Sequence, residues 1–429
     1  MKNRSVKQQA AVLTLANIFT RALGFVLRVV LSRLMGAQAL GVMELSHSAH
    51  MLSIAPVTAG LPMAVSRITA RDRTDAALRA GRRTVWQFSC LCMPLWLVLS
   101  PVIAYLMHDM RVLPALWAFT PCIVVLGLSA VYNGYCYGLG NAWPPALSEM
   151  LEQVLRFSLS FLLLTQLPTL TVAGRAAVPA VATATAEGAG LLLVIWLLRR
   201  EKQPPAACAL PAARREILRL SLPLTVSRLM TTFIRAASGA LIPLRLIASG
   251  LSNAAATEAL GMLQGMVMPV LFLPGVVTGA LGTVGTPAIA ARRGEGQQRM
   301  AIALFLSALG CGLAGAAGIY ALSGFLSRTV YHLPALQPLF RCAAPLTLLF
   351  ALQHAANGVL AGLGKQKRSL LPALTGALFS LLFQYIMIAQ PARRIFGAVQ
   401  AMIYGQSVTL LWMLGILFFE LKHAKKPTA

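Results

Sequence analysis

The chain has 429 residues, of which 57% are apolar or aromatic and 11% are charged. Soluble domains carry about 25% charged residues, so this composition excludes a soluble globular protein. Because a membrane-spanning helix needs about 20 apolar residues, the apolar sequence is sufficient for about a dozen spans. The net charge of +25 falls mainly between the apolar stretches, where it predicts cytoplasmic loops and not a nucleic-acid-binding surface.

The apolar stretches predict about twelve transmembrane helices, in a multi-pass protein with both termini in the cytoplasm. Alternate connections hold most of the Lys and Arg residues, as the positive-inside rule requires of cytoplasmic loops. The basic N-terminal segment is interpreted as the start of an uncleaved first span. The expected spans lie near 10–33, 42–65, 84–107, 114–137, 146–167, 177–198, 217–247, 255–285, 300–325, 336–360, 370–390 and 396–420.

The segment 199–216 contains two consecutive prolines, a third nearby, and charge at both ends. Such a composition is typical of a linker. We therefore expect an N-terminal six-helix lobe over 1–205 and a C-terminal six-helix lobe over 206–429. The expected fold class is an all-α polytopic membrane protein with two pseudo-symmetric lobes.

An internal repeat supports this division. The segment 131–141 reads VYNGYCYGLGN and 355–365 reads AANGVLAGLGK, and two further short matches occur in the same order. Because an even number of spans separates the copies, the halves share one membrane orientation, and their facing surfaces are expected to enclose a central cleft. Chance similarity between helices rich in small residues is the alternative.

The repeated residues are interpreted as structural, or as a hinge. Glycines permit close helix packing and a left-handed cap at a helix end, where Asn can satisfy exposed carbonyl groups. The residues concerned are Asn133, Gly134 and Gly138 with Asn357, Gly358 and Gly362, together with Pro62 and Pro287.

Polar residues follow one face of the first span. Asn17, Arg21, Gly24 and Arg28 are spaced by four, three and four residues, which places both arginines on one face of a helix. An Arg at the bilayer centre costs at least about 2.5–3.5 kcal/mol, so this face is expected to line a water-filled cavity. The alternative is that Arg28 extends to the membrane interface and serves only topology.

The seventh span has a comparable stripe that contains Arg228, Thr231, Arg235, Ser238 and Arg245. Guanidinium groups form planar pairs of hydrogen bonds with phosphate and carboxylate. If the two spans occupy equivalent places in facing lobes, Arg21, Arg28, Arg228 and Arg235 would grip an anionic headgroup. For Arg245, extension to the interface is the favoured reading.

Glu187 lies in the middle of the sixth span without a basic neighbour on its own turn. Intramembrane carboxylates often couple transport to an ion, so Glu187 is a candidate site for a cation or proton. The alternative is a carboxylate held at a helix contact by a distant Arg. Glu149, Glu152 and Arg156 form a stripe that favours ion pairing within one helix.

No sequence pattern indicates an enzyme. The seven Cys and six His residues have no metal-ligand spacing, and there is no nucleotide-binding loop or catalytic triad. We therefore expect no catalytic residue, metal site or cofactor. A membrane-embedded transferase would need an acidic metal site or a His/Asp pair near the membrane surface.

Three segments resemble a known family: TRALGFVLRVVLSRLMGAQALG, AGLPMAVSRITA, and the stretch from Leu241 to Glu295. They are similar to the stage V sporulation protein B-like branch of the multidrug/oligosaccharidyl-lipid/polysaccharide exporter superfamily. The first segment also resembles the start of lipid II flippases, in which an Arg-x-x-Gly-Phe element and a following Arg line the central cavity. The resemblance assigns those places to Arg21, Gly24 and Phe25, and to Arg28 with one residue inserted.

The resemblance implies a flippase that moves an anionic lipid-linked saccharide, either a peptidoglycan precursor or a polysaccharide unit, across a bacterial plasma membrane. Its expected partners are that lipid, the membrane lipids and a coupling cation or proton. Lipid II flippases have two further C-terminal spans that line a groove for the lipid tail, whereas the spans expected here end near residue 420. This difference leaves room for another cargo, and a multidrug or metabolite cation-coupled antiporter of the same fold is the alternative.

Overall fold

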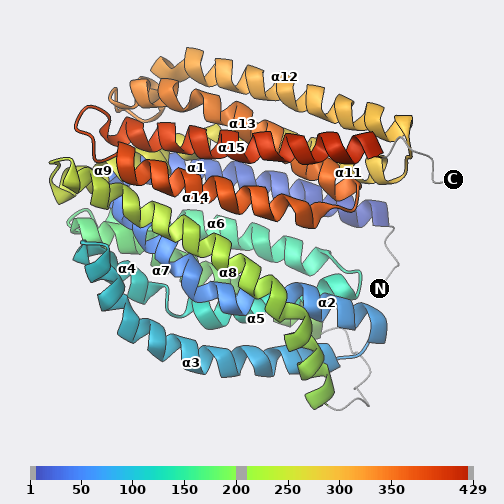
Figure 1. Ribbon diagram of the computed structural model, residues 1–429. Coiled ribbons are helices and arrows are strands. Elements are labelled where there is room, and N and C mark those ends of the chain that lie inside the picture. Colours follow the sequence, from blue (N-terminus) through green and yellow to red (C-terminus); the bar gives the residue numbers. More distant parts are fainter. Residues whose placement is uncertain (1–5, 200–209, 424–429) are drawn as a thin grey trace. The chain divides into compact units, whose positions relative to one another are not determined.

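The computed structural model describes residues 6–199 and 210–423, and within the described part every regular element is a helix (Figure 1). The fifteen α-helices are α1 (Val6–Thr58), α2 (Leu61–Asp72), α3 (Ala76–Leu106), α4 (Leu113–Ala118), α5 (Cys122–Gly138), α6 (Trp143–Gln166), α7 (Val172–Arg199), α8 (Leu210–Ala248), α9 (Asn253–Leu260), α10 (Met268–Leu271), α11 (Leu273–Ala290), α12 (Glu295–Phe325), α13 (Leu336–Gly362), α14 (Leu370–Met387) and α15 (Arg394–His423). Two 3₁₀-helices, η1 (Met110–Val112) and η4 (Gln366–Ser369), and two π-helices, η2 (Gly261–Val267) and η3 (Leu326–Val330), connect or extend them.

The chain divides into two compact units, Met1–Gly239 and Ala240–Ala429. Most of α8 belongs to the first unit, because Ala213 and Ile217 are part of a core cluster with residues of α2, α3 and α5. The expected lobe boundary between residues 205 and 206 lies outside the described residues. The assignment of lobes 1–205 and 206–429 therefore stays a prediction.

In the described part of the chain, ten helical segments are long and apolar enough to cross a membrane, or eleven if the bent pair Met110–Ala118 and Cys122–Gly138 counts as one span. The protein is thus a multi-pass membrane protein. The number differs from the expected twelve for local reasons. One segment, Leu15–Asp72, covers most of the first two expected spans, and α6 does not count because it has three charged residues within its apolar sequence. The span expected near 255–285 instead forms two segments, Asn253–Leu271 and Leu273–Ala290.

A sharp kink separates the first two expected spans. Gly36 lies within α1 at φ 77° and ψ 163°, which is outside the helical region. A side chain is strongly disfavoured in this conformation, whereas glycine adopts it without strain. The kink therefore divides α1 into a first segment that carries Arg21 and Arg28 and a second that carries Glu44.

Both units repeat the same core with a constant offset of 224 residues. Val65 on α2 corresponds to Ile289 on α11, and each is fully buried in an apolar cluster of its unit. Four further pairs with this offset belong to the same two clusters: Ala77 and Ala301, Ala80 and Leu304, Val131 and Ala355, and Tyr135 and Val359. The two units are therefore copies of one helical packing.

The repeated glycine motif lies where two helices of each unit make close contact. A Cβ atom on Gly134 would lie 2.5 Å from the carbonyl oxygen of Pro62, so α5 packs directly on the backbone of α2. In the second unit, the Thr286 hydroxyl of α11 donates to the carbonyl of Gly358 on α13 at 3.1 Å. The glycines thus serve close packing, as expected.

Each motif ends its helix in the same way. Gly140 and Gly364 have φ of 72° and 70°, and each lies two residues beyond the last residue of α5 or α13. The next amide then donates back into the helix, from Asn141 to Cys136 and from Lys365 to Leu360. This confirms the left-handed cap. Asn133 lies inside α5, where its Oδ1 is buried without a hydrogen-bond partner, and its expected role in the cap stays a prediction.

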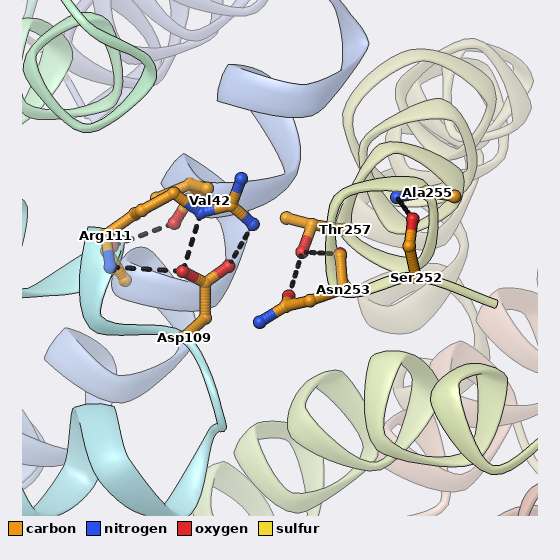
Figure 2. Close-up of polar contacts among 8 residues, drawn as sticks. Val42, Asp109, Arg111, Ser252, Asn253, Ala255 and Thr257 are labelled. Carbon is orange, nitrogen blue, oxygen red and sulfur yellow. Dashed lines mark hydrogen bonds and ion pairs between the residues drawn. The ribbon is translucent and has the colours of Figure 1, made fainter.

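Short polar contacts fix two of the connections between helices (Figure 2). Before α4, the buried Asp109 carboxylate accepts from the backbone amide of Arg111 at 3.0 Å and pairs with its guanidinium group at 2.6 Å. In the second unit, the Ser252 hydroxyl accepts from the amide of Ala255 and caps α9. Such contacts satisfy amide groups that have no partner within the helix.

Candidate substrate-binding and ion-coupling site

The first predicted stripe lies on the first segment of α1, before the kink at Gly36. Asn17 and Arg21 are exposed, whereas Gly24 and Arg28 are half-buried. A Cβ atom on Gly24 would lie 3.8 Å from Oε1 of Gln153, so this part of the segment faces α6. The helix is continuous from Asn17 to Arg28, and the spacing therefore places the four residues along one face.

Arg28 forms an ion pair with Glu44, which lies beyond the kink on the second segment of α1. The side chain of Glu44 is 8% exposed and that of Arg28 is 31% exposed. Because Gly36 lies between them, the pair joins the two segments of α1. Glu44 therefore compensates the Arg28 charge within the first unit and occupies the position that an anionic ligand of Arg28 would take.

Glu187 on α7 is held by Arg156 on α6. Nη2 of Arg156 lies 2.7 Å from Oε1 of Glu187, and the two side chains are 22% and 12% exposed. The alternative that the sequence left open, a carboxylate held by a distant Arg, is therefore the observed geometry. Arg156 reaches across to α7 and does not pair with Glu152 on its own helix.

Glu152 completes this buried polar layer between α6 and α7. Its Oε1 accepts a 2.6 Å hydrogen bond from the Ser148 hydroxyl. Gly190 on α7 contacts the Glu152 side chain so closely that any larger residue would displace it. His47 of α1 is half-buried. The first unit therefore contains two ion pairs, Arg28–Glu44 and Arg156–Glu187, within its predicted membrane-spanning helices.

The second predicted stripe lies on α8, and its members differ in their surroundings. Arg228 and Arg235 are exposed, and neither has an ion-pair partner among the described residues. Arg245 donates through Nε to the carbonyl of Tyr385 at 2.9 Å, and its guanidinium lies 4.0 Å from the centre of that ring. Arg245 therefore joins α8 to α14, whereas Arg228 and Arg235 are exposed on the surface of α8.

The α8 stripe approaches the second segment of α1. A Cβ atom on Gly239 would lie 3.1 Å from Oγ of Ser48, so the two helices are in contact at this point. Ser48 is one turn from Glu44, and Gly239 is one turn from Arg235. The structure thus brings the stripe of α8 near the Arg28–Glu44 pair within the first unit.

Sequence reasoning missed the partners of these charges. Arg156 was assigned to its own helix and Arg28 was given no carboxylate partner, because helical spacing relates residues of one helix and not of two. The requirement that buried charges be paired could have indicated that Glu187 has an Arg partner, but not which one. Among the described residues, no group of three or more His, Cys, Asp or Glu side chains could hold a metal ion.

A family model described as "Polysaccharide biosynthesis protein" matches residues 6–292. The match covers more than half of the sequence. The chain belongs to the polysaccharide biosynthesis protein family. The expected kinship with oligosaccharide exporters is therefore confirmed.

Individual relatives agree with this assignment. Stage V sporulation protein B of Bacillus subtilis (strain 168) is 28% identical over 433 residues, which cover 96% of this chain and 83% of the relative. The lipid II flippase MurJ, in an inward closed conformation, superposes with a TM-score of 0.77 at 12% identity and covers 97% of this chain and 90% of its own.

An inward-facing multidrug resistance MATE family transporter of the MOP superfamily superposes with a TM-score of 0.73 at 18% identity, with 95% of this chain and 96% of that chain covered. The superpositions establish the fold, but at such low sequence identity they do not establish the cargo. The expected exporter fold is thereby confirmed, and the protein is an all-α membrane protein with the architecture of this superfamily.

Proposed function

We propose that this family member is a flippase, a membrane transporter and not an enzyme, that moves an anionic lipid-linked saccharide across a bacterial plasma membrane by alternating access. The saccharide would be a peptidoglycan precursor or a polysaccharide unit. The kinship with a sporulation protein and the fold shared with a lipid II flippase support a lipid-linked cargo.

The observation that carries the proposal is the set of arginines on α1 and α8. Arg228 and Arg235 have no carboxylate partner in the described part of the chain, and Arg21 has none either. Unpaired arginines in membrane-spanning helices are costly unless they face water or an anionic ligand. With Asn17, Gly24 and Arg28, they form the proposed binding surface for the phosphates of the lipid carrier.

Ion coupling would reside in the layer between α6 and α7. Glu187 can exchange its Arg156 partner for a proton or a cation, which would release Arg156 and change the contact between two helices. A cation or proton gradient would then give direction to transport. No nucleic acid takes part in the proposed mechanism, and the basic loops would contact anionic lipid headgroups.

The second candidate is a cation-coupled antiporter of drugs or metabolites. The favouring observation is the number of buried carboxylates in the first unit, because Glu44, Glu152 and Glu187 are each at most 9% exposed. Two of the three are ion-paired with arginines, however, so they offer little net negative charge to a cationic drug. This arrangement favours an anionic cargo.

A transport assay separates the two candidates. The purified protein is reconstituted into vesicles that contain a fluorescent pyrophosphate-linked lipid saccharide, and the label is reduced by a reagent that cannot cross the membrane. A flippase makes the inner-leaflet label accessible, and protein-free vesicles give the background. Movement of a cationic dye against an ion gradient, without lipid translocation, would instead establish the antiporter.

A further inference from the structure

An apolar groove lies on the second unit, between three helices that run side by side in Figure 1: α12, α13 and α15. Its volume is about 380 Å³, within the range of small-molecule sites. The side chains that line it are entirely apolar: Ala301, Ile302, Phe305, Leu306, Val359, Leu414, Leu417, Phe418 and Leu421. An apolar groove on a membrane helix fits a hydrocarbon chain.

The equivalent surface of the first unit is covered by protein. With the offset of 224 residues, Ala301, Ile302 and Val359 correspond to Ala77, Leu78 and Tyr135. These three residues pack in one cluster with Ala213 and Ile217 of α8. In the first unit, an apolar face of α8 thus packs on the surface whose counterpart lines the groove in the second unit.

One end of the groove is surrounded by basic residues. Gln298 on the first turn of α12 donates to the carbonyl of Leu421 at 2.6 Å, which joins the start of α12 to the end of α15. Lys365 and Arg368 both reach Glu420, beside Leu421. Two cations thus share one carboxylate, and one positive charge remains uncompensated.

Arg299 adds a further charge at this end. It lies one turn before Ile302 on α12 and is 84% exposed, and its pair with Glu295 is long, at 3.6 Å. Exposed pairs of this kind hold their charges only weakly, so Arg299 can bind an external anion. Basic side chains next to an apolar groove complement a molecule with an anionic head and an acyl chain.

We propose that this groove is a binding site for one anionic phospholipid of the membrane, with an acyl chain between α12, α13 and α15 and the phosphate near Arg299, Lys365 and Arg368. The site lies within the second unit and does not depend on the transported cargo. In the first unit, α8 packs on the equivalent surface. In the second unit, the acyl chain of the lipid would cover it.

The test uses the full-length purified protein and two photoactivatable lipids with identical acyl chains, one a phosphatidylglycerol and the other a phosphatidylcholine. Cross-linked peptides are mapped by mass spectrometry. We expect the phosphatidylglycerol probe to label peptides around 301–306 and 414–421, and unlabelled phosphatidylglycerol to compete. Arg299→Gln should weaken this labelling about fivefold, because it removes one basic residue near the headgroup.

A matched pair of variants separates the groove from the general lipid surface. Leu306→Trp fills the groove and should abolish labelling, whereas Leu313→Trp, on the same exposed face of α12 but outside the groove, should leave it unchanged. Both replaced residues are more than half exposed, so the fold should tolerate the changes. Equal labelling by phosphatidylcholine, or competition by a polyprenyl phosphate alone, would overturn the proposal.

Discussion

At the residue scale, the ion pair between Arg156 and Glu187 is the contact on which the coupling proposal depends. Removal of one partner from a buried pair leaves an uncompensated charge and costs about 3–5 kcal/mol, whereas removal of both costs much less. We therefore expect Glu187→Gln and Arg156→Gln each to destabilise the protein strongly. The double variant should regain most of the loss in reversible unfolding in mixed micelles.

The matched control for this cycle is the more exposed pair Asp75 and Arg79, whose atoms are 2.9 Å apart, close to the 2.7 Å between Arg156 and Glu187. Its side chains are 27% and 41% exposed, so its coupling energy should stay below about 1 kcal/mol. A coupling between Arg156 and Glu187 as small as this control would mean that Glu187 is not held by the pair.

Glu44 gives a second prediction at this scale. Because the Glu44 carboxylate is paired with the Arg28 guanidinium, an anionic lipid must displace this carboxylate before it can bind Arg28. Glu44→Gln should therefore raise the affinity for a pyrophosphate-bearing lipid about tenfold, which corresponds to one charge-assisted hydrogen bond. The control is Glu149→Gln, at an exposed carboxylate of α6. Weaker lipid binding by Glu44→Gln would show that Arg28 needs Glu44 to be positioned.

At the element scale, the two copies of the glycine motif are alike in sequence but differ in how closely the neighbouring helix packs against them. A Cβ atom on Gly134 would lie 2.5 Å from a backbone oxygen of α2, whereas one on Gly358 would be 3.5 Å from its nearest neighbour, Gly282. Gly134→Ala should cost about 1–3 kcal/mol through overpacking. Gly358→Ala should be neutral or slightly stabilising, because Ala is a better helix former.

Thermal unfolding of the purified variants checks this difference, with Gly188→Ala as a reference substitution that meets no atom within 4 Å. If both motif variants lose the same stability, the packing of α5 on α2 is looser than the structure indicates.

The sequence predicted the repeated helices and their caps well where glycine residues determine the local structure. The repeat was visible in five identical positions, and its glycine caps follow from the conformational freedom of that residue. The core pairs with the same offset escaped detection, because most of them combine different apolar residues, such as Tyr135 with Val359. Any apolar residue of suitable size fills a core, so such pairs leave little trace in one sequence.

Only the arginine stripes of the candidate site could be predicted from the sequence, and the partners of the charged residues could not. The stripes on α1 and α8 follow from helical periodicity, and the structure keeps them on continuous helices. The partners of Arg28 and Glu187 depend on the kink at Gly36 and on the packing of α6 against α7. Both are tertiary features, and periodicity within one helix does not encode them.

At the scale of the whole molecule, the distribution of basic residues predicts the topology. Both termini and the connections near Arg79, Lys202, Arg293 and Lys367 should be cytoplasmic. Single cysteines introduced at these positions, in a variant without the seven native cysteines, should resist a membrane-impermeant thiol reagent in intact cells. They should react after the cells are opened, and labelling from outside at any one of them would refute the topology.

The central claim is that the arginine stripes bind the phosphates of a lipid-linked saccharide. The most direct measurement is the affinity of purified, folded variants for a polyprenyl pyrophosphate lipid at moderate salt. Arg235→Ala tests it cleanly, because the structure gives Arg235 no ion-pair partner among the described residues. We expect Arg235→Ala and Arg28→Ala each to lower the affinity about ten- to a hundredfold. Lysine at position 235 should rescue only in part, and Arg83→Ala, at an exposed residue of α3, should bind normally. Unchanged affinity of both Arg28→Ala and Arg235→Ala would contradict the account.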